Sequence, residues 1–286
     1  MPELPEVETM RRGILPIVGA TIVTAERTPC PKRPISIKPR IDRLNKRLVG
    51  QKIKAIERLG KRVVIRTQDD QRLLLEPRMT GLVLIDEPPT AKHLRFRLKL
   101  KGRKTKELLF WDQRGLGCVY LLSDQEYRDK VNDGSIGPDA IEISADELRE
   151  RMSKSRREIK VALLDQSMVA GVGNLYASEL LHKAGIDPRL RCNRVTQAQW
   201  IRIHRAMVDI LLEAIKSEGS TLSDGTYRNA LNDPGNYQNQ HQVYDRAGLS
   251  CPKCGVSKIV RIVQAQRSTF FCKGCQRKRD LPRTAK

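Results

Sequence analysis

Four cysteines near the end of the chain occur as two closely spaced pairs. Cys251 and Cys254 form one CxxC pair, and Cys272 and Cys275 form a second pair after seventeen intervening residues. Each pair offers two thiolates from one tight turn, and four thiolates close a tetrahedral zinc site. Such a site leaves no open ligand position, so its metal is structural and not catalytic. The spacing predicts one structural Zn²⁺ in a small module.

The residues between the two pairs support that module. The segment VRIVQAQRSTFF has strand composition and predicts a zinc-bound β-hairpin. Disulfides are the alternative, but the chain has no secretory context that would favour them. The other cysteines, Cys30, Cys118 and Cys192, are isolated, as is typical of reduced thiols in an intracellular protein.

The chain is strongly basic. Its 286 residues include 54 Lys and Arg against 33 Asp and Glu, which gives a formal net charge of +21. Residues 27–66 hold fourteen bases against two acids, and residues 251–286 hold ten against one. Such an excess of positive charge is self-repulsive, and proteins that carry it usually bind a polyanion. We therefore expect nucleic acid as the partner, although a halo of solvated Lys and Arg, or a ribosome-bound protein, has a similar composition.

The hydrophobic pattern changes along the chain. Segments with strand composition dominate up to about residue 130, namely RVVIRT, RLLLEP, GLVLID, HLRFRLKL and ELLFWD. HLRFRLKL alternates apolar and basic residues, so one face should pack while the other meets water or phosphate. Helical segments follow a Gly- and Pro-containing linker, namely SADELRERM, REIKVALLDQSM, NLYASELLHKAG and TQAQWIRIHRAMVDILLEAIKSEG. The polar stretch STLSDGTYRNALNDPGNYQNQHQ predicts a long functional or disordered loop.

No segment suggests a membrane or export signal. The chain has no run of eighteen apolar residues, and its first twenty residues lack a basic start followed by an apolar stretch. We expect a cytoplasmic, nucleoid-associated protein without membrane contact.

The stretch GVGNLYASELLHKAGIDP is a second motif. Gly171 and Gly173 allow a tight turn, and Asn174 is expected to cap a helix that begins at Leu175. Free N–H groups at such a helix start can cradle a phosphate, although glycines before a helix are more often a simple turn. The motif is not a dinucleotide fingerprint, because no parallel-strand unit surrounds it.

The N-terminal stretch MPELPEVETM contrasts with the basic chain, since its first eight residues contain three glutamates and no base. A short helix accounts for part of it. Pro5 suits the first helical position, Glu6 and Glu8 suit the first turn, and Gly13 suits the position after the last turn. This interpretation leaves Pro2 and Glu3 unexplained.

The motifs PELPEVET, GVGNLYASE and QRSTFFC follow one another over nearly the whole chain and together resemble formamidopyrimidine-DNA glycosylases. The sister family, endonuclease VIII, has Gly where this chain has Leu4. The resemblance implies an α+β fold: an N-terminal β-sandwich with flanking helices, a helix-two-turns-helix domain and a C-terminal zinc-finger β-hairpin. The expected boundaries are a catalytic domain at 2–130, a linker at 131–143, a DNA-binding domain at 144–238, a zinc finger at 239–280 and a basic tail at 281–286.

The resemblance also implies an activity. Members of the family are bifunctional glycosylase/AP lyases of base excision repair that remove oxidised purines (formamidopyrimidines and 8-oxoguanine) through a proline iminium and β,δ-elimination. Removal of Met1 would leave Pro2 as the nucleophile. Glu3 would serve as acid and base, Glu6 would orient the N-terminus, and Lys61 would steady a phosphate or the leaving base.

Further positions match DNA-contacting residues of the family. In that family, duplex DNA that carries a damaged base or an abasic site lies between the two halves of the protein. We expect this chain to act as a monomer. Three side chains fill the space left by the flipped base, and here they would be Met79, Arg114 and Leu116. Three other positions match phosphate contacts, namely Lys160, Asn174 and Arg267. Tyr176 matches the family as well, although a role in the core would explain it equally.

The chain departs from the family pattern around the base-replacing residues. The motif HLGMSG reads EPRMTG, and DPRRFG reads DQRGLG, so that Gly115 replaces an Arg and Leu116 replaces a Phe. Gly115 is expected to make this loop more flexible. The cysteine spacing is one residue longer than usual, and the loop at 221–237, which closes over the flipped purine in the family, keeps only STL. Chemistry should survive these changes, whereas the choice of lesion is open.

Two other functions remain open at the level of sequence. One is an endonuclease VIII-like glycosylase that prefers oxidised pyrimidines or lesions in single strands. The other is a non-catalytic protein that binds damaged DNA, although the presence of Pro2, Glu3, Glu6 and Lys61 argues against it.

Overall fold

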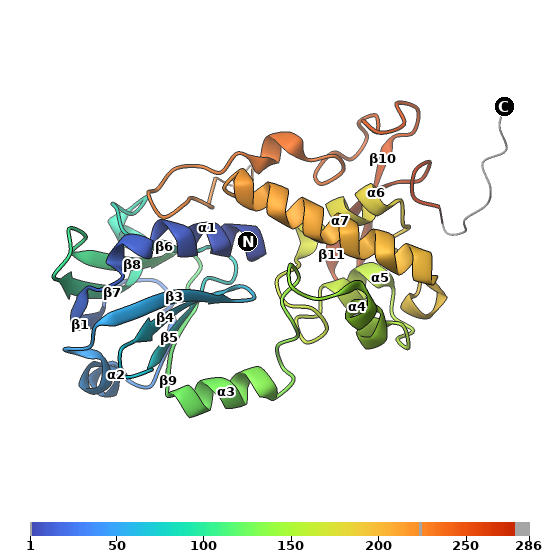
Figure 1. Ribbon diagram of the computed structural model, residues 1–286. Coiled ribbons are helices and arrows are strands. Elements are labelled where there is room, and N and C mark those ends of the chain that lie inside the picture. The colour runs from blue at the N-terminus through green and yellow to red at the C-terminus, as the bar shows by residue number, and fades with distance from the viewer. Residues whose placement is uncertain (1, 223–224, 278–286) are drawn as a thin grey trace. The chain divides into compact units, whose positions relative to one another are not determined.

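The computed structural model describes residues 2–222 and 225–277, so the basic tail at 281–286 lies outside the described residues. The chain forms two compact units (Figure 1). The first comprises Met1–Ser135 and Ala214–Gln238, and the second comprises Ile136–Glu213 and Asn239–Lys286. Residues 214–238 pack within the N-terminal unit, whereas the expected DNA-binding domain spans 144–238.

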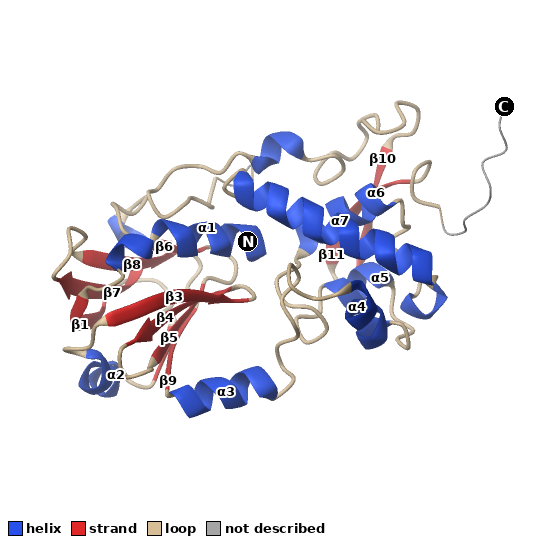
Figure 2. Ribbon diagram, viewed as in Figure 1, coloured by secondary structure: helices blue, strands red, loops and turns tan. Residues whose placement is uncertain are grey.

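The described residues of the first unit contain two β-sheets (Figure 2). The four-stranded sheet has the order β1-β7-β8-β6, all antiparallel, with strands at Thr21–Arg27, Leu94–Lys101, Glu107–Asp112 and Gly81–Leu84. The five-stranded sheet has the order β2-β9-β5-β4-β3, with strands at Ser36–Lys38, Cys118–Leu122, Arg72–Glu76, Arg62–Thr67 and Ile53–Leu59. Its only parallel pair among the described strands is β2 with β9.

The hydrophobic core of this unit draws residues from both sheets, as expected for a β-sandwich. Ile65 of β4, Leu73 of β5 and Phe110 of β8 belong to the same buried cluster. The central residues of β4 and β5 are buried on both faces, which explains why their segments read as continuous apolar runs. All five segments expected to be strands form β4, β5, β6, β7 and β8.

Three α-helices flank the sheets: α1 at Leu4–Gly13, α2 at Ile41–Leu48 and α3 at Asp124–Asn132, with short 3₁₀ turns at Leu15–Ile17 and Ala91–His93. Helix α1 packs against β3, β4 and β6. It begins one residue before Pro5 and includes Gly13, which the sequence placed just after it.

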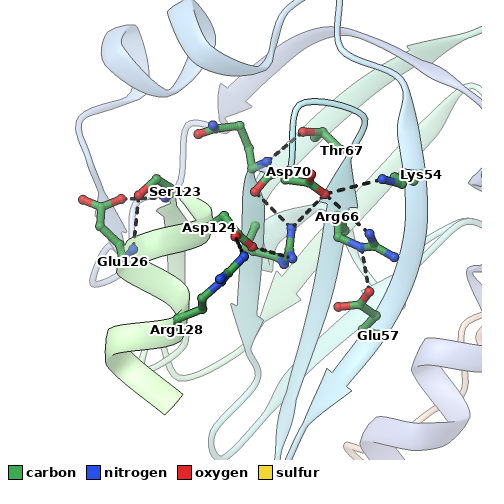
Figure 3. A network of polar contacts seen from close by, with 11 residues as sticks. Lys54, Glu57, Arg66, Thr67, Asp70, Ser123, Asp124, Glu126 and Arg128 are labelled. Carbon is green, nitrogen blue, oxygen red and sulfur yellow. Dashed lines mark hydrogen bonds and ion pairs between the residues drawn. The ribbon is translucent and has the colours of Figure 1, made fainter. Parts of the chain in front are cut away.

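Helix α3 is held by polar contacts and contains no buried residue. Its N-cap Ser123 and Glu126 form a capping box, and Asp124 accepts a hydrogen bond from Arg72 of β5 at 2.8 Å (Figure 3). The same Arg72 lies 3.6 Å from Asp70, which also pairs with Lys54 and Arg66. A network of ion pairs therefore ties α3 to the start of the central strand β5, whereas an apolar stripe would ordinarily hold a helix in place.

The polar stretch after α7 is part of the core of the first unit. Tyr227 and Ala230 belong to its buried cluster, and the carbonyl of Ala230 accepts the N–H of Ile85 at 3.1 Å. Apart from a 3₁₀ turn at Tyr237–Gln240, its described residues contain no helix or strand, so it is an ordered loop built around a few buried anchors.

The second unit contains four α-helices within its described residues. They are α4 at Ala145–Met152, α5 at Ile159–Leu163, α6 at Asn174–Ala184 and most of α7 at Gln197–Lys216, with a 3₁₀ turn at Cys192–Arg194. Ser144 caps α4 by accepting the N–H of Glu147 at 3.1 Å, as the sequence predicts. None of the described helices has both the length and the apolar character of a membrane span.

A β-hairpin completes the second unit, as the segment between the cysteine pairs predicts. Strands β10 (Ile259–Gln264) and β11 (Arg267–Cys272) pair in an antiparallel manner. Ala265 and Gln266 connect them with φ values of +45° and +61°, the geometry that suits the twist of a two-residue hairpin. Val243, Ile259 and Phe270 form a small core beside the cysteines.

Candidate active site

The N-terminus of α1 is buried in the first unit. Pro2 is buried, and the Glu3 and Glu6 side chains are each only 3% exposed. Glu3 is the N-cap residue of α1, and its N–H donates to the Glu6 carboxylate at 2.8 Å. Two carboxylates are thus held beside Pro2 in surroundings that exclude most water.

Glu6 also binds the loop that follows α7. Its second oxygen accepts the N–H of Ser220 at 2.9 Å. Gly219 has a φ of +79°, and a Cβ at that position would lie 2.9 Å from the Glu6 carboxylate. The hydroxyl of Tyr227 donates to the Glu218 carbonyl at 3.0 Å and lies 3.4 Å from the Glu6 carbonyl oxygen. Glu6 therefore connects the N-terminus with the loop at 217–238, a link that local sequence could not reveal.

Glu8 has a different environment from the other two glutamates. Burial alone would raise its pKa, but hydrogen bonds from Arg11 and Arg12 and the charge of Arg58 lower its pKa to about 2. Glu8 is therefore ionised at any physiological pH and holds α1 to β3 instead of transferring protons.

Lys61 lies in the two-residue turn between β3 and β4, after Gly60, whose φ is +56°. Arg58 supports this turn, because its guanidinium donates to the Gly60 carbonyl at 3.1 Å and lies 3.2 Å from Glu8. The contacts of Arg58 therefore fix the Lys61 turn to the helix that begins at the buried N-terminus.

Two loops carry the residues expected to replace a flipped base, and Asp112 joins them. One Asp112 oxygen accepts the Thr80 hydroxyl and the Arg114 N–H, and the other accepts the Gly117 N–H at 2.7 Å. Met79 and Leu116 are partly exposed and Arg114 is exposed. The structure therefore brings the three residues onto one pair of linked loops.

In the second unit, Lys160 is buried in a polar cluster. Its side chain is 1% exposed, and its ammonium donates to Asn174 Oδ1 at 2.7 Å, to the Ser268 carbonyl at 2.9 Å and to Thr269 Oγ1 at 2.8 Å. Asn174 is partly exposed and Arg267 is exposed at the hairpin end. A direct phosphate contact from Lys160 is not supported, because three protein acceptors already surround its ammonium. Lys160 instead joins α6 to β11.

Two details of the second motif differ from expectation. Gly173 is the N-cap of α6 and Asn174 is its first residue, so Asn174 does not cap the helix. Tyr176 is fully buried, which agrees with a role in the core.

The four cysteines have the geometry of a zinc site. Their Sγ atoms all lie within 4.8 Å of one another, and the Cys251–Cys275 and Cys254–Cys272 separations are both 3.8 Å. Four sulfurs at 2.3 Å from a tetrahedral Zn²⁺ are about 3.8 Å apart. Backbone N–H groups of Ser257 and Val256 lower the pKa of Cys254 to about 6. The cluster therefore fits one structural Zn²⁺.

Comparison with known proteins gives a consistent result along the chain. Residues 1–119 match the formamidopyrimidine-DNA glycosylase N-terminal domain, residues 136–226 match the H2TH domain of the same enzyme, and residues 248–277 match a zinc finger found in FPG and IleRS. The formamidopyrimidine-DNA glycosylase of Chloroflexus aurantiacus is 40% identical over 282 residues, covering 96% of this chain and 98% of that protein. The chain belongs to the formamidopyrimidine-DNA glycosylase family.

Solved structures of family members agree. A complex of a Lactococcus lactis FPG variant with a Fapy-dG containing DNA superimposes with a TM-score of 0.86 at 34% identity, covering 97% of this chain and all of that one. A complex of the Lactococcus lactis Fpg with an abasic site containing DNA has a TM-score of 0.85 at 34% identity, covering 96% of this chain and all of that one.

Three residues of the second unit support the family's zinc finger and were not singled out in the sequence. Glu179 is 1% exposed and accepts the N–H groups of Gln242, Val243 and Tyr244, and burial raises its pKa. His182 Nε2 lies 3.4 Å from Cys251 Sγ, and Gln276 donates to the Ile186 carbonyl at 2.9 Å. The signal that could have identified Glu179 is an acid at the end of the otherwise uncharged motif GVGNLYASE, since a carboxylate that becomes buried there needs donors.

The expectation that Gly115 loosens the family's base-replacing loop is wrong. Gly115 is buried with a φ of +64°, and a Cβ there would lie 2.2 Å from the Arg33 carbonyl. Arg95 adds a second support, because its guanidinium donates to the carbonyls of Asp112 at 2.7 Å and Gln113 at 3.3 Å. Arg95 is itself buried, although alternation in β7 predicted that it faces water. The loop is held closely by the segment that contains Arg33.

Gly115→Ala should therefore lower the free energy of unfolding by about 2–4 kcal/mol, because it adds a clash to an unfavourable φ. Gly102 provides the matched control, since its φ is +85° and a Cβ added there would have no atom within 4 Å. Gly102→Ala should lower the free energy of unfolding by only about 1 kcal/mol. Urea unfolding of both variants measures the difference, and equal losses would show that the Arg33 carbonyl does not confine the loop.

Proposed function

We propose that the chain is a bifunctional DNA glycosylase/AP lyase of base excision repair that removes oxidised purines. The observation that carries the proposal is the buried start of α1, where Pro2 lies beside Glu3 and Glu6 and where Glu6 binds both the Glu3 and the Ser220 N–H groups. Burying two carboxylates beside Pro2 costs free energy and does not help the chain to bind a polyanion. Acid–base chemistry at Pro2, by contrast, requires such carboxylates.

Pro2 is the proposed nucleophile once Met1 is removed. An α-amine titrates near pH ~8 and lysine near ~10.4, so a larger fraction of the α-amine is unprotonated at neutral pH. Its nitrogen bonds to C1′ of the damaged nucleotide, and the bond from C1′ to the base breaks with the base as leaving group. Opening of the sugar then gives an iminium. Because a secondary amine leaves no N–H on that iminium, it stays cationic and acidifies the 2′ hydrogen, so β-elimination cleaves the strand and δ-elimination follows on the other side.

The carboxylates have separate roles in this proposal. Glu3 protonates the sugar ring oxygen as the ring opens and moves protons in the later steps. Glu6 acts through position, because its two oxygens hold backbone N–H groups on either side of the site. Lys61 contacts a phosphate or the leaving base from its fixed turn.

The DNA contacts divide between the two units. Met79, Arg114 and Leu116 would fill the gap left by the flipped base, since apolar wedges recover part of the lost stacking. Asn174 and Arg267 would contact phosphates and so position the duplex without reading its sequence. We also propose that the protein acts as a monomer on the DNA of the nucleoid.

Borohydride trapping on a duplex with one abasic site tests the activity, and a panel of duplexes with formamidopyrimidine, 8-oxoguanine or oxidised pyrimidines tests the substrate. We expect a covalent adduct and faster excision of the purine lesions. Faster excision of oxidised pyrimidines would assign an endonuclease VIII-like preference. Tight binding without any adduct would assign a damaged-DNA-binding protein.

Leu116 should limit the excision of well-stacked lesions, because Leu has no flat π face with which to stack on the remaining bases. Leu116→Phe should raise excision of 8-oxoguanine from duplex DNA roughly threefold or more and leave abasic-site cleavage nearly unchanged. Leu15→Phe is the matched control, since Leu15 is 42% exposed in the same unit and outside the site. If wild-type protein excises 8-oxoguanine as fast as it cuts abasic DNA, and Leu116→Phe changes neither rate, Leu116 is not a wedge.

A further inference from the structure

Arg78, the residue before Met79, has an unusual backbone conformation. Its φ is +50°, in the left-handed region that glycine adopts without penalty and that an arginine adopts only at a cost. The turn is closed by the Gly81 N–H, which donates to the Pro77 carbonyl at 2.9 Å. A glycine would suit this backbone better, so the arginine side chain calls for an explanation of its own.

The Arg78 side chain is placed by Glu76. One Glu76 oxygen accepts Arg78 Nε at 3.1 Å, and the other accepts Arg62 Nε at 3.0 Å. Arg62 directly follows Lys61 in the turn between β3 and β4. Glu76 therefore links the Lys61 turn to the Met79 loop through two ion pairs.

The ion pair with Glu76 does not explain why an arginine occupies position 78, because it adds little to the stability of the fold. The Arg78 side chain is 49% exposed, and an ion pair at such a position contributes little to folding. Among the contacts described for this part of the chain, Glu76 engages Nε and no acceptor is found for the two terminal Nη groups. A guanidinium held by Nε presents those two groups as a fork, which matches the oxygens of a phosphate.

We propose that Arg78 is a further DNA-binding residue, whose guanidinium binds a backbone phosphate next to the nucleotide whose flipped base Met79 replaces. Glu76 is its positioning residue. The proposal rests on the proposed function, because it takes the duplex to lie against the Met79 loop. It adds a phosphate contact that is tied through Glu76 and Arg62 to the Lys61 turn, so the two loops meet the DNA backbone in a fixed relation.

Arg78→Gly separates this role from a structural one, because the two roles predict opposite changes. The variant relieves the backbone, so the midpoint of urea unfolding should stay the same or rise. It removes one phosphate contact, so affinity for a duplex with a tetrahydrofuran abasic analogue should fall about tenfold, and the slope of log K against log salt should decrease by about 1. Arg78→Lys should keep the salt slope and recover part of the affinity.

Arg128→Ala is the matched control, because Arg128 is also an exposed arginine paired with a carboxylate, Asp124, in the same unit. It should change neither the affinity nor the slope. An Arg78→Gly variant with wild-type affinity and slope overturns the proposal, as does an Arg128→Ala variant with an equal loss. Failure of the wild-type protein to bind the abasic duplex or to form a borohydride adduct would instead count against the proposed function.

Discussion

Freeing the nitrogen of Pro2 should raise strand cleavage at abasic sites by at least about 10³-fold, the scale of effect expected when a nucleophile is restored. The comparison uses protein made with a leader sequence that a site-specific protease removes to leave Pro2 first. An acylated Pro2 nitrogen has no lone pair available for C1′, whereas the freed secondary amine does. Cleavage of an abasic duplex before and after removal of the leader measures the effect.

The same preparation supplies its own control, because duplex affinity depends on basic residues elsewhere and should change less than the cleavage rate. Mass spectrometry of the borohydride-trapped species should find the added mass on Pro2. An adduct on Lys61, or trapping of equal yield from protein that retains the leader, would assign the nucleophile to a lysine.

Loss of zinc should have the second large effect. Cys272→Ser removes one of the four thiolates, and a structural zinc site supplies folding energy directly to the segment that it closes. The hairpin β10–β11 carries Arg267, one of the two proposed phosphate contacts, and also Ser268 and Thr269, which accept hydrogen bonds from Lys160. Its release therefore displaces a phosphate contact and removes two partners of a buried lysine. We expect less than one zinc per chain and at least about a tenfold loss of duplex affinity.

Cys192→Ser is the matched control for that variant. Cys192 is buried in the same unit but lies outside the cysteine cluster. The Cys192→Ser variant should retain one zinc per chain, as measured by atomic emission, even if the substitution lowers the free energy of unfolding. Full zinc content and unchanged affinity in Cys272→Ser would show that the four cysteines are not the ligand set.

The sequence predicted those parts of the molecule that depend on residues close together in the chain. The hairpin between the cysteine pairs follows from turn spacing and strand composition, and β4 to β8 follow from their apolar runs. Helix α3 could not be predicted from local sequence, because it buries no residue. It depends instead on Arg72, which lies 52 positions before Asp124. The parallel pairing of β2 with β9 likewise joins segments that no local pattern connects.

The site shows the same limit. Motif resemblance pointed to Pro2, Glu3, Glu6 and Lys61, and the spacing of the two CxxC pairs pointed to the cysteines, since all of these lie within short patterns. The Ser220 partner of Glu6, the role of Asp112 between two loops and the Arg33 carbonyl at Gly115 are all contacts between distant segments. Lys160 was singled out because it matches a phosphate-contacting position of the family, and a motif match could not show that its ammonium is buried among three protein acceptors.

The hydrogen bond from Ser220 to Glu6 spans 214 positions of the chain and has a consequence for synthesis. The N-terminal end emerges from the ribosome first, yet its unit is completed only when residues 214–238 follow. Contacts of such long sequence separation form late, because the intervening chain must be ordered or looped out before they can close. A nascent chain therefore carries its proposed nucleophile long before the carboxylate beside it is fixed in place. The protein becomes competent only when most of its length has been translated.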